Sequence, residues 1–344
     1  TVFGTDTNKE VVNIINQGNV HIVEPELDTF VRSAVASGRL SASVNPREAD
    51  IYLICVPTPL HKNKFPPCPN INYVLEACRN IAPLIKNGDL IILESTSPVG
   101  TTNQIYSLLK NVGVDVENIH IAYCPERVLP GKIIKELEEN DRIVGGLTNI
   151  STKIASNFYQ NFISGKVFKT DANTAEMCKL TENSFRDINI AFANELSIIC
   201  EKENINVWNL IRLANRHPRV DILNPGVGVG GHCIAIDPWF IVARDFKNSK
   251  LISTARKVNE SKTTWVADKI KATAADVMLK SDRKPIIACF GLSFKPDIDD
   301  LRESPALDIA LSLKTSGYDI IAVEPNIVSH ENIEILEFNE AIDQ

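Results

Sequence analysis

The stretch Asp50-Ile-Tyr-Leu-Ile-Cys-Val56, followed at once by Pro57-Thr58-Pro59, decides the class of fold that the sequence predicts. It is a continuous apolar run that stops abruptly at a proline-rich turn. Such a run is typical of a strand buried in a parallel sheet. Because ligands bind at the carboxyl ends of parallel strands, we expect the turn that contains Thr58 to face a ligand.

The same arrangement recurs twice farther along the chain. The run Leu90-Ile-Ile-Leu-Glu94 ends at Ser95-Thr96-Ser97-Pro98, and Ile119-His-Ile-Ala-Tyr123 ends at Cys124-Pro-Glu126-Arg127. Helical stretches are predicted between these runs. The alternation of buried strands and helices indicates an α/β fold with a doubly wound sheet.

The first residues, Thr1-Val-Phe-Gly-Thr-Asp6, resemble the end of the second strand of a Rossmann fold. An acidic residue at that place takes the ribose hydroxyls of NAD. The glycine-rich phosphate loop of that fold lies about 20 residues earlier. We therefore expect the first strand and its phosphate loop to be missing from this chain.

A second α/β unit is predicted near the other end. Pro285–Gly291 and Asp319–Val323 have the composition of strands, and Pro305–Thr315 that of a helix. The chain then stops in a helix-like segment, so this second sheet is also expected to be unfinished.

No helix breaker occurs between about Asn173 and Glu203, so one helix of roughly 45 Å is predicted there at 1.5 Å per residue. Such a helix links two domains or builds a subunit interface. Its polar residues recur at three- and four-residue steps and therefore share one face; they are Glu176, Lys179, Asn183 and Arg186. The face has two interpretations, a solvated charged stripe or a functional surface.

A glycine-rich loop, Pro225-Gly-Val-Gly-Val-Gly-Gly-His-Cys233, leads to Asp237-Pro238. Its glycines are expected to let the backbone pass close to a bulky ligand. The spacing predicts Asp237 as the N-cap of a helix that runs to Phe246. A thiol one turn before a helix N-terminus lies in positive potential, which favours its thiolate form.

Cys233 is thus a candidate nucleophile, and the alternative is a small buried residue, as most free cysteines are. The same loop satisfies the spacing G-x-G-x-x-G over 226–231. Asn224-Pro225 precedes it rather than a buried strand, so we do not expect a dinucleotide loop there.

Composition limits the possible partners. The 344 residues carry a net charge of −7, which argues against a nucleic-acid partner, and suffice for two or three domains. No apolar run approaches the roughly 20 residues that span a bilayer, so no membrane partner is expected. The eight cysteines form no CxxC pair, which predicts reduced thiols in a cytoplasm and no metal site.

A nucleophilic cysteine beside an NAD-type sheet suggests oxidation through a covalent thioester. Such a reaction needs a cation or an amide to hold the developing alkoxide, and Lys179 with Asn183 has suitable spacing. It also needs carboxylates that move protons, for which Glu126 and Asp237 are available.

Seven stretches together resemble the UDP-glucose/GDP-mannose dehydrogenase family along nearly the whole chain. They are Val56-Pro-Thr-Pro59, Glu94-Ser-Thr-Ser-Pro-Val-Gly100, Tyr123-Cys-Pro-Glu-Arg-Val-Leu-Pro-Gly131, Thr174-Ala-Glu-Met-Cys-Lys-Leu-Thr-Glu-Asn183, Ala214-Asn-Arg-His-Pro-Arg-Val220, Gly230-Gly-His-Cys-Ile-Ala-Ile-Asp-Pro-Trp239 and Phe290-Gly-Leu-Ser-Phe-Lys295 through Arg302-Glu-Ser-Pro305.

The resemblance implies a four-electron oxidation with two NAD⁺, which turns the C6 hydroxymethyl group of a UDP-linked sugar into a carboxylate. It implies that Cys233 forms the thioester and that Asp237 is an acid/base group coupled to a lysine. Lys179 and Asn183 would stabilise the oxyanion, and Glu126 with Thr96 would handle the hydrolytic water.

The resemblance also implies binding residues. Those for NAD are Asp6, Thr58, Thr96 and Arg302. Those for the nucleotide sugar are Arg127, His217, Arg219, Gly230, Phe294 and Lys295, with Arg219 reaching the substrate of a neighbouring subunit.

Two departures from the wider family, Ala235 in place of a proline and Pro130 in place of a glutamate, fit its acetamido-sugar branch. The mannosamine epimer is the expected substrate, with the glucosamine epimer as an alternative. A second alternative is a nucleotide-sugar-binding protein without catalysis, because the glycine-rich phosphate loop expected before residue 1 is missing.

The expected architecture is two Rossmann-like doubly wound domains joined by a long central helix, both outer domains being incomplete in this chain. The predicted boundaries are 1–171 for NAD binding, 172–280 for a central helical dimerisation and catalytic domain, and 281–344 for UDP-sugar binding. The long helix favours a homodimer or a higher homo-oligomer.

Overall fold

The computed structural model of the chain describes residues 1–22, 24–61, 63–128, 131–296 and 298–344. Pro130, one of the two departures noted above, lies outside the described residues. The chain divides into two compact units, Thr1–Leu180 and Thr181–Gln344. The three predicted domain ranges stay a prediction.

A five-stranded sheet forms the core of the first unit, in the order β3-β6-β7-β8-β9. All neighbouring pairs are parallel except β7 and β8, which are antiparallel. The strands are β3 (Ile51–Ile54), β6 (Leu90–Leu93), β7 (His120–Tyr123), β8 (Arg142–Gly146) and β9 (Val167–Asp171). The three predicted buried strands are confirmed, whereas β8 and β9 were not anticipated from the sequence.

Helices cover both faces of this sheet. Ile91 and Leu93 pack in one cluster with side chains of α3 and α4, whereas Leu90 and Ile92 pack in another with α6. Successive side chains of a strand point to opposite faces of the sheet. Since helices cover both faces, all four of these residues are buried. The helices are α3 (Asn72–Ile81), continued by a 3₁₀ turn over Ala82–Leu84, α4 (Thr101–Asn111) and α6 (Asn149–Tyr159).

The first residues form a separate two-stranded parallel sheet. Val2 pairs with Leu40 and Thr5 with Ser43. Among the described residues β1 pairs only with β2, and β3 pairs only with β6. The elements are β1 (Val2–Thr5), α1 (Lys9–Asn16), α2 (Leu27–Ala36) and β2 (Leu40–Ser43).

The first unit also contains a short hairpin and a short helix. They are the antiparallel hairpin β4 (Leu60–His61) and β5 (Cys68–Pro69), and α5 (Ile133–Glu139).

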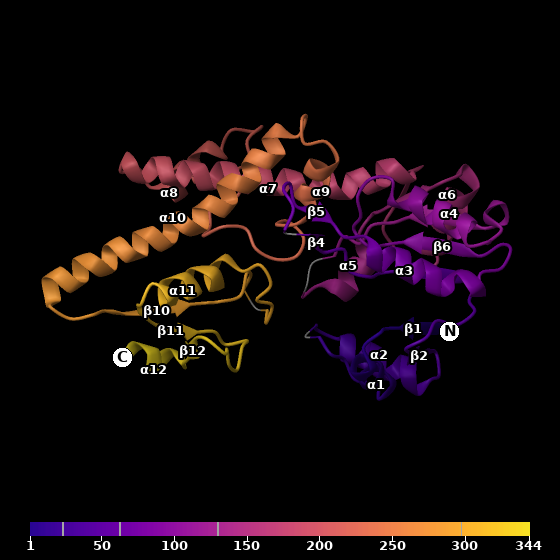
Figure 1. Ribbon diagram of the computed structural model, residues 1–344, viewed down its shortest axis with the longest axis horizontal. Helices are drawn as coiled ribbons and strands as arrows, with labels where there is room; N and C mark the ends of the chain where they lie inside the picture. Colours follow the sequence, from indigo (N-terminus) through magenta and orange to yellow (C-terminus); the bar gives the residue numbers. More distant parts are fainter. Residues whose placement is uncertain (23, 62, 129–130, 297) are drawn as a thin grey trace. The chain divides into compact units, whose positions relative to one another are not determined.

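The predicted long helix is confirmed as α7 (Ala172–Lys202), within which the division between the two units falls. The second unit continues with α8 (Val207–Ala214), α9 (Asp237–Arg244) and α10 (Lys250–Ser281). Figure 1 shows α10 as one long helix whose end leads directly to β10.

The last part of the second unit is a small parallel sheet in the order β10-β11-β12. Leu313 of α11 and Ala267 of α10 pack on one side with Ile320 and Ala322, and Ala341 of α12 packs with Ile321 on the other. Figure 1 shows this order from α10 through α11 and the sheet to α12. The elements are β10 (Ile286–Phe290), α11 (Pro305–Thr315), β11 (Asp319–Val323), β12 (Glu334–Ile335) and α12 (Phe338–Ile342).

The prediction of Asp237 as an N-cap is wrong. Ile236 occupies the cap position, and Asp237 is the first residue of α9, which ends at Arg244 rather than Phe246. The reason is a tight turn just before the helix, in which the amides of Ile236 and Asp237 both donate to the Cys233 carbonyl, at 3.0 and 2.8 Å. The Asp237 side chain is therefore not needed as a cap.

The interpretation of the α7 face as a solvated charged stripe is wrong for two of its members. Glu176 is 0% exposed and Asn183 is also buried. The Glu176 carboxylate accepts from the amides of Gly100 and Thr102, at 2.6 and 2.8 Å, and from the Thr102 hydroxyl at 2.7 Å. Glu176 thereby caps the amino end of α4, where unpaired amides and the helix dipole favour a negative charge.

Replacing Glu176 with alanine should destabilise the first unit. Three donors at the start of α4 would lose their acceptor. A buried donor left unpaired costs about 1–3 kcal/mol, so we expect the free energy of unfolding to fall by about 3 kcal/mol. Urea unfolding followed by circular dichroism measures this loss.

The control is Glu203→Ala, which removes an exposed carboxylate just beyond the end of α7, the helix that contains Glu176. Its free energy of unfolding should stay within about 0.5 kcal/mol of the parent protein. Equal losses in the two variants would contradict the capping role.

Candidate active site

The loops after β3 and β6 lie side by side in the first unit. The Thr58 hydroxyl donates to the Thr96 carbonyl at 2.6 Å, and the Ser95 hydroxyl donates to the Ile54 carbonyl at 3.2 Å. The structure thus joins Thr58 and Thr96, both predicted to contact the cofactor. Thr96 is half-buried, so it lies at the edge of the sheet rather than within the core.

Glu94, which directly follows β6, links groups from other parts of the first unit that the sequence did not single out. Its carboxylate accepts from the Cys55 thiol at 3.3 Å and from the hydroxyl of Tyr159 in α6. The Arg142 guanidinium lies over the Tyr159 ring, with its Cζ atom 5.5 Å from the ring centre. The two contacts of Glu94 join residues 39 and 65 positions apart, which local sequence patterns do not reveal.

The predicted water-handling residue Glu126 follows β7 and is held by a buried arginine. Arg142 is only 2% exposed, and its Nη1 lies 3.4 Å from Glu126 Oε2. The amide of Arg127 donates to the other Glu126 oxygen. The Arg127 side chain itself donates to the Asp141 carbonyl at 3.0 Å.

Four of the eight free cysteines are poor nucleophiles, among them Cys55, whose pKa is raised mainly by burial. Burial raises the pKa of the Cys78 and Cys124 thiols to about 12 each, and it also raises the pKa of Cys289. These thiols stay protonated at neutral pH, whereas the thiolate is the reactive form.

The first unit fits an NAD-type cofactor in part. Asp6 directly follows β1, as predicted, and is exposed. Its Oδ1 accepts from the Asn8 amide at 2.8 Å, which fixes the start of α1. Within the described ranges no glycine-rich turn joins a strand to a helix, so we assign no residue to a pyrophosphate.

In the second unit the structure joins two predicted catalytic residues. The Asn183 side-chain amide donates to Asp237 Oδ2 at 2.5 Å, and both residues are buried. Cys233 lies one turn before Asp237 and is half-buried, so its thiol belongs to the same local structure. Lys179 lies in the first unit, so its predicted pairing with Cys233 stays a prediction.

Part of the glycine loop packs closely on other residues of the second unit, while the expected approach of a ligand to its backbone stays a prediction. A Cβ on Gly230 would lie 2.6 Å from the Glu303 carbonyl and 2.7 Å from Phe294 Cβ. A Cβ on Gly231 would lie 2.7 Å from the Phe294 ring, and the Gly231 amide donates to the Arg302 carbonyl at 3.2 Å. The predicted substrate residues Gly230 and Phe294 are therefore in contact.

Arg302, predicted to bind NAD, is paired with Asp300. The closest of these contacts joins Nη2 and Oδ2 at 2.6 Å, and His232 Nδ1 lies 3.7 Å from the same oxygen. The hydrogen bond from Arg302 lowers the pKa of Asp300, so this carboxylate stays charged. The half-buried Lys295 lies next to Phe294 in the chain.

His217 and Arg219 are exposed in the loop after α8. Two asparagines hold this loop. Asn215 binds both backbone groups of Ile222, at 2.8 and 2.9 Å, and Asn189 of α7 accepts from the Leu223 amide at 3.0 Å. The loop is thus tied to the helices, while the role of Arg219 toward a neighbouring subunit stays a prediction.

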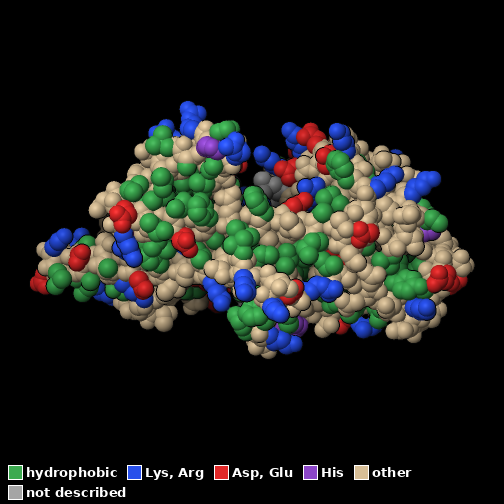
Figure 2. Space-filling model, turned by 90° about the horizontal axis from the view of Figure 1, so that it is seen from above, with side chains coloured by type: hydrophobic (Ala, Val, Ile, Leu, Met, Phe, Trp, Pro, Cys, Tyr) green, Lys and Arg blue, Asp and Glu red, His purple; other side chains and the backbone are tan. Residues whose placement is uncertain are grey.

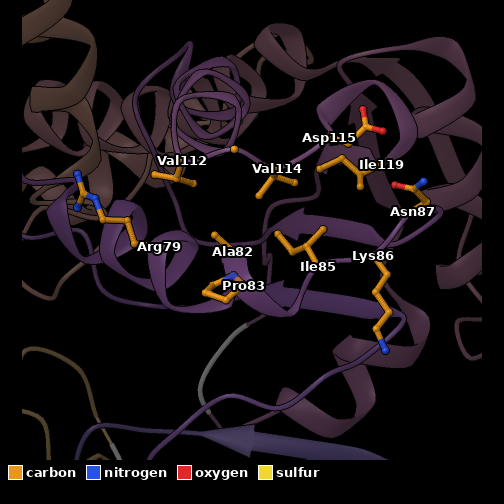
Figure 3. Close-up of a pocket in the computed structure, with 11 residues that line it drawn as sticks. Arg79, Ala82, Pro83, Ile85, Lys86, Asn87, Val112, Val114, Asp115 and Ile119 are labelled. Atoms are coloured by element: carbon orange, nitrogen blue, oxygen red, sulfur yellow. The ribbon is translucent and has the colours of Figure 1, made fainter.

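A cavity of about 410 Å³ lies at the end of the five-stranded sheet where the parallel strands β6 and β7 begin. Asn87 and Ile119, which line it, precede β6 and β7, whereas the candidate site residues follow these parallel strands. Figure 3 shows the charged ends of Arg79 and Lys86 pointing away from its apolar side chains. The cavity is therefore separate from the candidate active site.

Among the described residues there is no group of three or more His, Cys, Asp or Glu side chains that could hold a metal ion. The described helices include none with both the length and the apolar composition needed to cross a membrane.

Comparison with known proteins gives matches over nearly the whole chain. Residues 1–163, 173–261 and 288–344 match, in turn, the NAD binding domain, the central domain and the UDP binding domain of the UDP-glucose/GDP-mannose dehydrogenase family. The UDP-N-acetyl-D-mannosamine dehydrogenase of Escherichia coli is 53% identical over 339 residues, which cover 95% of this chain and 80% of that protein.

Two further relatives are informative. The NDP-N-acetyl-D-galactosaminuronic acid dehydrogenase of Ralstonia nicotianae is 52% identical over 95% of this chain and 78% of its own length. The structure of UDP-N-acetyl-mannosamine dehydrogenase from Staphylococcus aureus is 39% identical, with a TM-score of 0.86, over 97% of this chain and 78% of that chain. Its likeness confirms a Rossmann-type domain, a central helix and a C-terminal α/β domain.

The packing of the glycine loop predicts different effects for two glycine-to-alanine variants. Gly230→Ala places a Cβ against backbone and ring atoms, whereas the nearest atom to a Cβ on Gly226 is 3.6 Å away. Overpacking costs about 1–3 kcal/mol, so we expect Gly230→Ala to lower the free energy of unfolding by that amount. Gly226→Ala should change it by less than about 1 kcal/mol. Thermal unfolding of both variants gives the comparison, and equal stability would contradict the contact with Phe294.

Proposed function

Because the chain belongs to the UDP-glucose/GDP-mannose dehydrogenase family, we propose that it oxidises UDP-N-acetyl-D-mannosamine at C6 to UDP-N-acetyl-D-mannosaminuronate. The family carries out NAD-dependent oxidation of nucleotide sugars, and the chain is an enzyme of this kind. The identity to the E. coli enzyme, and Ala235 in the glycine loop, support the acetamido sugar as substrate.

The observation that carries the mechanism is the joint structure of Asn183, Asp237 and Cys233. A buried amide donates to a buried carboxylate, and one turn away lies a half-buried thiol. A fixed amide can hold a developing alkoxide, and a buried carboxylate can exchange protons with a neighbouring basic group. The same local structure therefore supplies the groups that a thioester route needs.

NAD, when bound, accepts a hydride in each of the two oxidation steps. In the first, the C6 alcohol loses a hydride to the cofactor and a proton to the acid/base group formed by Asp237 and its coupled basic residue, and an aldehyde results. The Cys233 thiolate then adds to the aldehyde carbon. Asn183 and Lys179 stabilise the negative charge on the oxygen. Loss of a second hydride from this carbon leaves a thioester on Cys233.

Hydrolysis of the thioester completes the reaction. Glu126, with Thr96, orients a water molecule and takes its proton, while the water oxygen adds to the thioester carbon. The carbon–sulfur bond then breaks, so that the sugar carboxylate and the Cys233 thiol are released. The contact with Arg142 orients the Glu126 carboxylate.

Binding residues follow from the same assignment. Asp6 takes the ribose of the cofactor, and Thr58, Thr96 and Arg302 contact the rest of it. Phe294, Lys295 and Gly230 form part of the nucleotide-sugar site. Arg127, His217 and Arg219 contribute the remaining polar contacts to the substrate.

The glucosamine epimer of the substrate is the nearest alternative, because a change at C2 alters a single acetamido contact. The Ralstonia relative acts on a differently named acetamido sugar at nearly the same identity, so identity alone does not select the epimer. A nucleotide-sugar-binding protein without catalysis is the second alternative. Initial rates with each UDP-N-acetylhexosamine distinguish the three.

We also propose that the enzyme is a cytoplasmic homodimer or higher homo-oligomer. The eight free cysteines favour a compartment in which thiols stay reduced. Phe185, Phe192 and Ile199 of α7 are exposed at seven-residue spacing, which places them on one face. Figure 2 looks onto the side of the molecule that carries α7 and α8 and shows hydrophobic side chains gathered there. A second copy of the chain would cover this surface.

Serine in place of Cys233 should nearly abolish the complete oxidation. The hydroxyl of serine is a much weaker nucleophile than a thiolate, so we expect turnover to fall by about 10³-fold or more. The measurement is NADH absorbance with UDP-N-acetyl-D-mannosamine and NAD⁺. Cys68→Ser, which changes another half-buried cysteine, should retain activity. Unchanged turnover of Cys233→Ser would rule out the covalent route.

A charge within the apolar stripe of α7 should separate the subunits. Phe192→Glu introduces a carboxylate in the proposed interface, where an unpaired charge is costly. We expect its mass in light scattering to be that of one chain and the parent mass to be at least twice as large. Phe168→Glu in β9, which is also exposed, should keep the parent mass. An oligomeric Phe192→Glu variant would contradict this interface.

A further inference from the structure

A chain of buried polar side chains runs from α10 to the glycine loop. Arg256 Nη1 donates to Asp187 Oδ1 at 2.7 Å, and the Asn259 amide donates to the same oxygen at 2.7 Å. Asn194 of α7 donates to Asn259 Oδ1 at 2.8 Å. All four side chains are at most 4% exposed. They form a continuous path between two long helices.

The path ends on the backbone of the loop that carries Cys233. The Gly226 amide donates to Asn194 Oδ1 at 2.8 Å. One residue later, the Thr263 hydroxyl of α10 donates to the Val227 carbonyl at 3.0 Å. The same hydroxyl oxygen lies 2.5 Å from the place that a Cβ on Gly228 would occupy. Asn194 and Thr263 therefore hold two successive residues of the loop by hydrogen bonds, and Thr263 packs close to the next one, Gly228.

Gly228 explains why the loop needs such support. Its φ of +146° lies in a region that other residues rarely adopt, and glycine is flexible enough to adopt many conformations besides this one. The loop contains four glycines within six positions. Without external hydrogen bonds this backbone would sample several paths, and Cys233 would move with it.

Stability alone does not explain the buried chain. A buried polar network adds specificity rather than stability unless every member is satisfied. Here Asp187 Oδ2 and Arg256 Nε lack a hydrogen-bond partner among the described residues. An apolar core of the same volume would avoid this cost, so the network is better explained by what it holds.

We infer that Asn194 and Thr263 are positioning residues for the reaction, which hold the start of the glycine loop so that Cys233 is presented in one place. The far end of the loop is held separately, because the Gly231 amide donates to the Arg302 carbonyl. Neither residue contacts the reacting atoms. The inference rests on the proposed role of Cys233 as nucleophile.

The test uses Thr263→Val, which keeps the shape of the side chain and removes the hydrogen bond to Val227. A displacement of about 1 Å in a reacting group can cost about 10²-fold in rate, so we expect kcat to fall by about 10-fold. The KM values for the UDP-sugar and NAD⁺ should stay within about twofold, because groups that bind them do not change. Amide hydrogen exchange of the peptide over 224–233 should become faster.

Two matched variants complete the test. Thr263→Ser restores the hydroxyl and should recover kcat, whereas Thr264→Val changes an exposed neighbour on the same helix and should have no effect. Asn194→Ala should give the same split between kcat and KM with a larger loss. Because Asn194 is buried, the conclusion rests on Thr263→Val if Asn194→Ala does not fold.

The outcomes separate clearly. A loss of kcat in Thr263→Val that serine restores, with faster exchange confined to the loop, supports the inference. An unchanged kcat overturns it. Faster exchange throughout the chain, together with a lower kcat and a correspondingly higher KM, also overturns it. If the parent enzyme lacked sugar oxidation, the proposed function would fail, while hydrogen exchange would still report whether Thr263 and Asn194 hold the loop.

Discussion

The contact between the glycine loop and the segment around Phe294 is the constraint on which the candidate nucleophile depends. The Gly230 backbone passes so close to Phe294 and the Glu303 carbonyl that no side chain fits between them. The start of the loop is bound to Asn194 and Thr263, and the Gly231 amide is bound to Arg302. Cys233 follows two residues after Gly231, so contacts within the chain set its position before any substrate binds. This close packing explains why residues 230 and 231 are glycines.

Much of the fold could be predicted because strong local signals agree with the tertiary structure. Asp319–Val323 and Pro305–Thr315 form a strand and a helix with the predicted bounds. Pro305 begins a helix whose cap is Ser304, a combination that sequence patterns identify well. The strands β8 and β9 could not be predicted in this way, because Gly145 and Gly146 weaken the strand pattern of β8. Tertiary packing explains these glycines, since a Cβ on Gly145 would lie 2.2 Å from the Asp171 carbonyl.

The candidate site was predictable only where residues are arranged by the ends of strands or by a single turn. Thr58 and Thr96 are joined because their parallel strands are neighbours, a relation that the sheet topology imposes. Glu94, Tyr159, Arg142 and Asn194 were missed, because their roles come from partners far away in the sequence. The local structure expected at Asp237 was wrong, since the turn at Cys233 already supplies the start of α9.

The measurement that tests the central claim most directly is mass spectrometry of the enzyme quenched during turnover. UDP-N-acetyl-D-mannosamine and NAD⁺ are mixed with the enzyme, the reaction is stopped in acid within its first turnover, and cysteine-containing peptides are analysed. The peptide that contains Cys233 should carry the mass of the acyl UDP-sugar, because a thioester survives acid, and the other seven cysteines should remain unmodified. An adduct on a different cysteine, or turnover with no adduct on any cysteine, would contradict the account.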